Sequence, residues 1–224
     1  MTENPRKIAI LGGTGALGGG LAKRWARAGH RIIIGSREAA KAEDAARALG
    51  GELAAAGLDA MAVSGTDNKS AAALAEIAVL TVPFAHHRAT LEDLGGALGG
   101  KILIDVTVPL MPPRVGTVQL PPEGSAAVAG QRLLGEAVKV VSAFQNVAAA
   151  HLTADGPIDC DVLICSDDKA AAAEVIELAE DAGMRGFYAG PLANSAATEA
   201  LTSLIIQVNR TYKCHAGIRL TGLS

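Results

Sequence analysis

Short apolar runs alternate with longer amphipathic segments along most of the chain. Runs rich in Ile, Val and Leu predict buried strands at 8–11, 31–35, 77–82, 101–106 and 139–144, and a weaker run predicts one at 60–63. The spacing of apolar residues predicts helices at 15–29, 38–49, 68–75, 86–98 and 125–134. Apolar strands that alternate with helices are typical of a parallel sheet covered by helices on both faces.

The pattern changes beyond residue 144. Strands are predicted at 162–165 and 187–189 with a helix at 169–182 between them, and a long final helix is predicted from about Ala193. Helical spacing in that last segment is kept by Ala197, Leu201, Leu204, Ile205 and Val208. Prolines crowd 109–122 and predict a stiff loop after the fifth strand. We therefore expect a doubly wound α/β domain in residues 1–144 and a small α/β C-terminal domain in residues 145–224.

A glycine-rich loop joins the first predicted strand to the first predicted helix. Gly13, Gly15 and Gly18 satisfy the G-x-G-x-x-G spacing in the strand–turn–helix context that this motif requires. Gly13 permits the tight turn, Gly15 lets the backbone approach a pyrophosphate, and Gly18 lets helix and strand pack closely. The phosphates would bind free N–H groups at the helix N-terminus. The motif predicts a Rossmann-type dinucleotide site; the simpler interpretation is an ordinary glycine-rich turn.

The end of the second predicted strand indicates which dinucleotide binds. An NAD site usually has Asp or Glu there to bond the ribose 2′-hydroxyl, whereas this chain has Ser36 and Arg37, with Lys41 one helical turn onward. A serine hydroxyl and two cations suit a 2′-phosphate. Cations that merely solvated a helix start would oppose the helix dipole. The segment therefore favours NADP(H).

The nicotinamide end of the cofactor is expected beyond the carboxyl ends of the next strands, where open α/β sheets bind ligands. Val82 and Pro83 follow the fourth strand, Val108 follows the fifth, and Ala143 ends the sixth. These small or apolar residues predict a lining for the ribose and the ring.

The sequence offers no clear acid or base for an alcohol dehydrogenase. It has neither a Tyr-x-x-x-Lys pattern nor a G-x-S-x-G elbow, and its cysteines match no metal-ligand spacing. His86, His87, His151 and His215 are each better explained as capping or packing residues. We therefore predict no catalytic side chain and no metal. That suits hydride transfer between two cofactors that the protein aligns.

The composition limits which kinds of partner and which cellular location we expect. The net charge of −3 and the 3% aromatic content argue against nucleic acid as a partner. Cys160, Cys165 and Cys214 form no disulfide framework, and no apolar run is long enough to span a bilayer. We expect a cytoplasmic protein that acts on small molecules and does not bind a membrane.

Five segments together resemble one known family. They are Gly12–Gly18, Gly35–Arg37 with Lys41, Ala78–Pro83, Gly190–Ser195 and Ala216–Arg219, and they are similar to NADPH-dependent coenzyme F420 reductases over almost the whole chain. The resemblance implies a Rossmann domain with a small C-terminal domain, a homodimer, and a deazaflavin stacked on the nicotinamide between the domains. It implies direct hydride transfer between NADPH and F420, as in 8-hydroxy-5-deazaflavin:NADPH oxidoreductases.

The resemblance also implies particular contacts. NADP would be contacted by Thr14, Gly15, Ala16, Leu17, Ser36, Arg37, Lys41, Val82, Val108 and Ala143. Ala216 would contact the deazaflavin. Gln145 stands where several family members have histidine, and it would lie against the deazaflavin; glutamine can donate a hydrogen bond there but cannot carry charge.

Two alternatives remain open from the residues. The same cofactor module would serve an NADPH-dependent flavin or ferric reductase, or an imine reductase. A non-catalytic NADP-binding redox sensor would need only the first ligand. The proline-rich loop and the glycine-containing C-terminal end favour enclosure of a second ligand, and therefore an enzyme.

Overall fold

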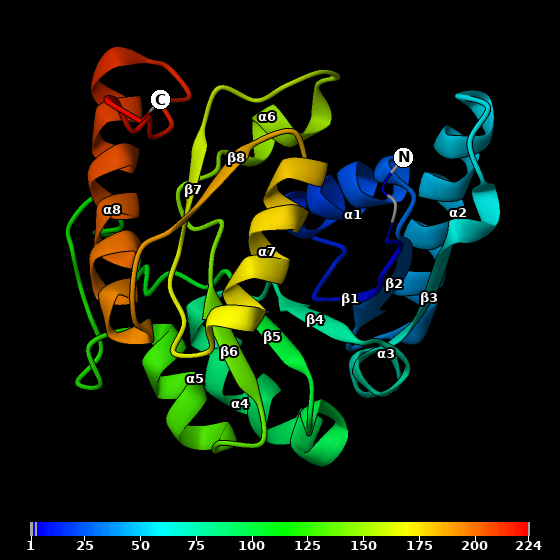
Figure 1. The fold of residues 1–224 in the computed structure, drawn as a ribbon, viewed down its shortest axis with the longest axis horizontal. Helices are drawn as coiled ribbons and strands as arrows, with labels where there is room; N and C mark the ends of the chain where they lie inside the picture. Colours follow the sequence, from blue (N-terminus) through cyan, green and yellow to red (C-terminus); the bar gives the residue numbers. More distant parts are fainter. Residues whose placement is uncertain (1, 3, 224) are drawn as a thin grey trace.

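A six-stranded parallel sheet forms the centre of the molecule in the computed structural model, which describes residue 2 and residues 4–223 (Figure 1). The strand order is β3-β2-β1-β4-β5-β6. The strands are β1 (Lys7–Leu11), β2 (Arg31–Ser36), β3 (Val63–Asp67), β4 (Ile77–Leu80), β5 (Ile102–Asp105) and β6 (Lys139–Ser142). The order reverses between β1 and β4, and ligands bind open α/β sheets at such a switch point. The predicted Rossmann-type fold is confirmed.

Helices cover both faces of the sheet because successive strand residues point to opposite sides. Ile8 and Ile10 of β1 pack with α1 (Ala16–Ala28) and α2 (Ala39–Ala55), whereas Ala9 and Leu11 pack toward the other face. That second face is covered by α3 (Asn68–Leu74), α4 (Phe84–Leu94) and α5 (Ala126–Leu134). Because the inner strands such as β4 and β5 are buried on both sides, their sequences are almost continuously apolar.

The C-terminal part adds a second, two-stranded parallel sheet. The sheet is formed by β7 (Asp161–Ile164) and β8 (Arg185–Tyr188). The helices of this part are α6 (Ala149–Thr153), α7 (Lys169–Asp181) and α8 (Ser195–Tyr212). Its core is continuous with that of the large sheet. Trp25 of α1 packs edge-to-face on Phe144 with ring centroids 5.7 Å apart, and its indole N–H donates to the Leu178 carbonyl of α7 at 2.7 Å. The second part therefore packs firmly on the first; the boundary at 144/145 stays a prediction.

Two sequence predictions miss the local structure. The strand predicted at 60–63 is wrong: Ala60–Ala62 form the 3-10 turn η1, which the Asp59 carboxylate starts by accepting from the Met61 N–H. The strand begins only at Val63, and its Val-Ser-Gly-Thr-Asp sequence is polar because β3 is a half-buried edge strand. The helix α6 lies in a stretch for which no helix was expected.

The apolar stripe of the final helix does not face the core. α8 is a helix as its spacing predicts, but its buried positions are Ser195, Thr198, Glu199 and Ser203. Leu204 and Val208 are 51% and 40% exposed. In Figure 1 this helix lies at the side of the molecule opposite to α2. None of the described helices is long and apolar enough to cross a membrane.

Candidate functional site

A pocket of about 340 Å³ opens beyond the carboxyl ends of β1, β2 and β4, and we call it the glycine-loop pocket. It is formed by the loop after β1, the end of β2, the start of α2, the start of α3 and the segment after β4. Seven of the residues predicted from the sequence line it, namely Thr14, Gly15, Ser36, Arg37, Lys41, Val82 and Pro83. The fold thus brings together residues that are far apart in the chain.

The glycine loop is packed too tightly for side chains at two of its positions. A Cβ on Gly13 would lie 2.7 Å from the Ile10 carbonyl oxygen, and one on Gly18 would lie 2.7 Å from Thr81 Oγ1. α1 begins at Ala16 without any side-chain cap. Its first N–H groups are therefore available to an anion, and the helix dipole favours negative charge at the same place.

The outer end of the pocket carries charged side chains. Ser36 ends β2 and is buried, and its Oγ accepts a hydrogen bond from the Glu38 N–H at 3.3 Å. Arg37 and Lys41 are exposed at the pocket, and Lys41 Nζ lies 2.6 Å from the Glu38 carboxylate. Two cations and a hydroxyl form the kind of group that binds a phosphate monoester.

Asn68 is a pocket residue that the sequence interpretation missed. It is buried at the start of α3, and its Oδ1 accepts from the Gly12 N–H at 3.2 Å. Gly12 has φ of 77°, and its N–H is shared with the Gly35 carbonyl at 3.1 Å. Asn68 therefore ties the phosphate loop to the start of α3, and the Gly35 carbonyl ties it to β2. The sequence gives little indication of this role, because it predicts the third strand at 60–63 and not directly before Asn68, where β3 ends.

A second group of polar side chains lies at the ends of β5 and β6, and we call it the β5–β6 end. His87 Nε2 lies 2.6 Å from Asp105 Oδ2, and both side chains are buried. Asp105 Oδ1 accepts from the Thr107 N–H at 3.0 Å. Gln145 Nε2 donates to the Asp105 carbonyl and to Ser142 Oγ, each at 2.8 Å. These polar groups hold two strand ends in place.

Beside this group, α8 binds the N-terminus of α5 through a buried carboxylate. Glu199 accepts from the Ala126 N–H at 2.7 Å and from the Ala127 N–H at 3.1 Å. Burial raises the pKa of Glu199 to about 8, although the two backbone hydrogen bonds act in the opposite direction. The contact anchors the end of the proline-rich loop, because α5 begins directly after it.

Comparison with known proteins decides the family. Residues 7–109 match the family described as NADP oxidoreductase coenzyme F420-dependent. The F420-dependent NADP reductase of Methanocaldococcus jannaschii is 43% identical over 223 residues, which cover 97% of this chain and 99% of that protein. The enzyme of the same name from Methanothermobacter marburgensis is 44% identical over 225 residues, covering 97% and 99%. This chain belongs to the F420-dependent NADP reductase family.

A solved structure agrees with this family assignment. It is a crystal structure from Arthrobacter sp. FB24, provisionally described as an F420-dependent NADP reductase, with 28% identity and a TM-score of 0.79. The alignment covers 96% of this chain and all of that one. The family resemblance and the NADP and F420 pairing expected from the sequence are confirmed.

The other residues that are predicted to contact the cofactors do not line the glycine-loop pocket. Gly13, Ala16 and Leu17 belong to the loop and the first turn of α1 that flank the pocket. Val108 is half-buried after β5, and Ala143 is fully buried after β6. Ala216 follows α8, where its N–H donates to Asn209 Oδ1 at 2.7 Å. These assignments, like that of Gln145, stay predictions.

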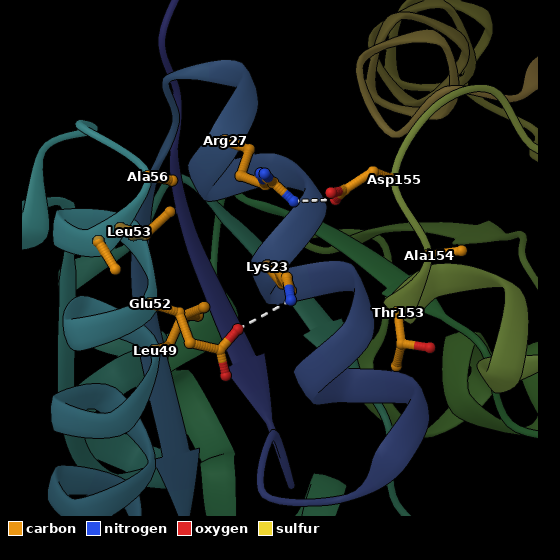
Figure 2. Close-up of a pocket in the computed structure, with 10 residues that line it drawn as sticks. Lys23, Arg27, Leu49, Glu52, Leu53, Ala56, Thr153, Ala154 and Asp155 are labelled. Carbon is orange, nitrogen blue, oxygen red and sulfur yellow. Dashed lines mark hydrogen bonds and ion pairs between the residues drawn. The ribbon is translucent and has the colours of Figure 1, made fainter.

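A larger cavity of about 600 Å³ lies at the other end of α1 and contrasts with the glycine-loop pocket. Figure 2 shows its two cations turned toward carboxylates of the protein itself. Lys23 pairs with Glu52 at 2.8 Å, and Arg27 pairs with Asp155. Because its charges are balanced internally, this cavity is a poorer candidate for an anionic cofactor than the glycine-loop pocket.

Proposed function

We propose that this protein is an 8-hydroxy-5-deazaflavin:NADPH oxidoreductase, which transfers a hydride directly between NADPH and coenzyme F420. One observation carries the proposal: a single pocket joins the glycine loop to Ser36, Arg37 and Lys41 on one side and to Val82 and Pro83 on the other. Relatives at 43–44% identity over nearly the whole chain are named F420-dependent NADP reductases.

The residues present fit NADP(H). Gly13 and Gly18, where a Cβ would collide with Ile10 and Thr81, allow the compact turn and helix packing of a pyrophosphate loop, and Gly15 leaves room for the phosphates to approach the backbone. Ser36, Arg37 and Lys41 supply the donors for a 2′-phosphate. A place for the second coenzyme is supported by Thr107, whose buried hydroxyl finds no hydrogen-bond partner among the described residues. Such a group at the end of a strand is typical of a site that a ligand completes.

The chain contributes positioning to this reaction. When bound, the nicotinamide and the deazaflavin would supply the hydride donor and acceptor. The free N–H groups at the start of α1 and the Arg37 and Lys41 cations would hold the phosphates, while Val82 and Pro83 would keep water from the reacting face. The rigid β5–β6 end would hold the site of the second coenzyme in place, so that the reacting carbons are held about 3–3.5 Å apart. No side chain is required as an acid or base.

The proposed activity is tested by mixing the protein with NADPH and F420 and following absorbance at 420 nm. We expect the absorbance to fall at a rate proportional to protein concentration. No change across a broad pH range, with folded protein, would contradict the proposal. Parallel assays with FMN and ferric chelates test the flavin and ferric reductase alternatives, and tight NADPH binding without turnover on any acceptor would indicate a sensor.

We also propose a cytoplasmic homodimer that associates through α8. Leu204, Val208 and Tyr212 are 51%, 40% and 74% exposed on this helix, and an exposed apolar stripe marks an interaction surface. The variant Leu204→Glu/Val208→Glu is expected to elute as a monomer in light-scattering chromatography. Ala48→Glu, on the exposed side of α2, is the matched control and should leave the mass unchanged. A monomeric wild type would contradict the dimer, and cell fractionation tests the location.

A further inference from the structure

The glycine-loop pocket contains a carboxylate among the groups that would bind a phosphate. Glu38 lines the pocket with Arg37 and Lys41. Its Oε1 lies 2.6 Å from Lys41 Nζ, and the two side chains are 66% and 63% exposed. A negative charge at this place is unexpected in a site for a 2′-phosphate, because like charges repel and the pair partly neutralises Lys41.

Helix capping does not explain this carboxylate. Glu38 is the residue that precedes the first turn of α2, where an acidic side chain often accepts from the first helical N–H groups. Here the side chain makes no such bond and turns to Lys41 instead, while its own N–H donates to Ser36 Oγ. The backbone of Glu38 therefore supports the end of β2, and its carboxylate adds a negative charge to the pocket.

The carboxylate has opposite effects on the two forms of the cofactor. A 2′-phosphate brings about two negative charges next to Glu38, so the carboxylate weakens its binding. An unphosphorylated ribose presents a 2′-hydroxyl, and an acidic residue at the end of the second strand is the usual acceptor for that group. One side chain can therefore reduce the preference for NADP that Ser36, Arg37 and Lys41 create.

We propose that Glu38 is a specificity-determining residue that opposes the 2′-phosphate and sets how strongly the site prefers NADP over NAD. The inference rests on the proposed NADP site. It predicts that removal of this one charge tightens binding of 2′-phosphorylated nucleotides selectively. Gln is the suitable replacement, because its amide oxygen can still accept from Lys41 and the shape of the site is retained.

The test compares two nucleotides by titration calorimetry on the full chain. The first is 2′,5′-ADP, which carries the 2′-phosphate, and the second is 5′-AMP, which lacks it. Glu38→Gln is expected to lower the Kd of 2′,5′-ADP about three- to tenfold at low ionic strength, with a smaller effect at high salt. The Kd of 5′-AMP should stay within about twofold or rise, since it presents no charge at that position. Glu38→Ala should change the 2′,5′-ADP affinity in the same direction.

The matched control is Asp44→Asn. Asp44 pairs with Arg47 at 2.7 Å on the same helix with the same three-residue spacing, and its side chain is 73% exposed, but it lies outside the pocket. This variant removes the same charge, so it should leave both affinities nearly unchanged.

Three results would overturn the inference: equal tightening in Glu38→Gln and Asp44→Asn, no change in Glu38→Gln, or weaker binding of 2′,5′-ADP by Glu38→Gln. The last would mean that Glu38 holds Lys41 in its binding position. Failure of the proposed NADP site would look different, because the wild type itself would then bind 2′,5′-ADP no better than 5′-AMP. Melting temperatures of all variants verify that each protein is folded.

Discussion

The glycine-loop pocket and the β5–β6 end lie at the same edge of the sheet but treat their polar groups differently. In the pocket, Arg37, Glu38 and Lys41 are exposed, and α1 starts without a side-chain cap. At the β5–β6 end, the side chains of His87, Asp105 and Gln145 are buried and bonded to the protein itself. The charged side chains of the pocket are hydrated and can bind a ligand, whereas the polar side chains of the β5–β6 end hold the protein rigid.

The difference follows from what each end has to do. A phosphate is held by charge, and cations that bind it must remain hydrated when the ligand is absent, because an unpaired buried charge is costly. Hydride transfer depends instead on the distance between two rings, and a misplacement of about 1 Å costs a large factor in rate. Substitutions in the two regions should therefore have different effects. Those in the glycine-loop pocket should change cofactor affinity, and those at the β5–β6 end should change stability and geometry.

The largest effect is expected at the β5–β6 end. Asp105→Leu should lower the free energy of unfolding by about 3–5 kcal/mol, because it leaves the His87 ring nitrogen and the Thr107 N–H buried without their acceptor. Asp105→Asn should cost less, since its amide can still accept from Thr107 and donate to His87. Chemical denaturation measures both. Affinity for 2′,5′-ADP should stay within about threefold in the folded protein, as expected for separate sites; a parallel loss of affinity would show that the ends are coupled.

The next largest effect is expected in the pocket. Arg37→Glu should lower kcat/KM for NADPH by roughly 100-fold and abolish the preference over NADH, because like charges facing each other at a binding site cost several kcal/mol. Unfolding free energy should change by less than about 0.5 kcal/mol, since Arg37 is exposed. Steady-state kinetics with both cofactors provide the measurement. Arg47→Glu on α2 is the control, and equal losses for NADPH and NADH would refute the assignment.

The third effect is on the pH dependence of stability, and it follows from the burial of Glu199. Glu199 has a pKa of about 8 in the folded protein, against an ordinary value of 4.5. The folded state therefore holds the extra proton between these values, and stability should fall as pH rises from about 4.5 to 8, by at most about 1.4 kcal/mol per pH unit. Glu199→Gln should flatten this slope in thermal melts taken across that range. Glu177→Gln, exposed on α7, should retain it; a slope that survives in Glu199→Gln would point to another group.

Much of the pocket could be predicted because its signals are local in the chain. The spacing of Gly13, Gly15 and Gly18 after an apolar run specifies a turn and a helix start, and Ser36 and Arg37 directly follow the second strand. Glu38 is the next residue, but its place in the pocket has no local signal. Whether its carboxylate faces solvent, caps α2 or enters the pocket depends on a rotamer that no sequence pattern reports.

The β5–β6 end could not be predicted in the same way. No sequence pattern indicates that the amide nitrogen of Gln145 donates to the Asp105 carbonyl and to Ser142, and its contact with the deazaflavin stays a prediction. The sequence predicts a packing or capping role for His87, and its buried bond to Asp105 joins residues on α4 and β5. Such pairings arise only when β5, β6 and α4 are brought together.

By itself the sequence determined the alternation of strands and helices, the parallel sheet, the phosphate loop and the cations at the end of β2. These features depend on periodicity and on neighbours within a few residues, which the chain displays directly. Only the tertiary structure decided that β3 begins at Val63, that Asn68 supports Gly12, that the apolar stripe of α8 faces outward and that Glu38 lies in the pocket. The physical reason is that burial and hydrogen-bond partners are properties of the packed chain, set by residues that are distant in sequence.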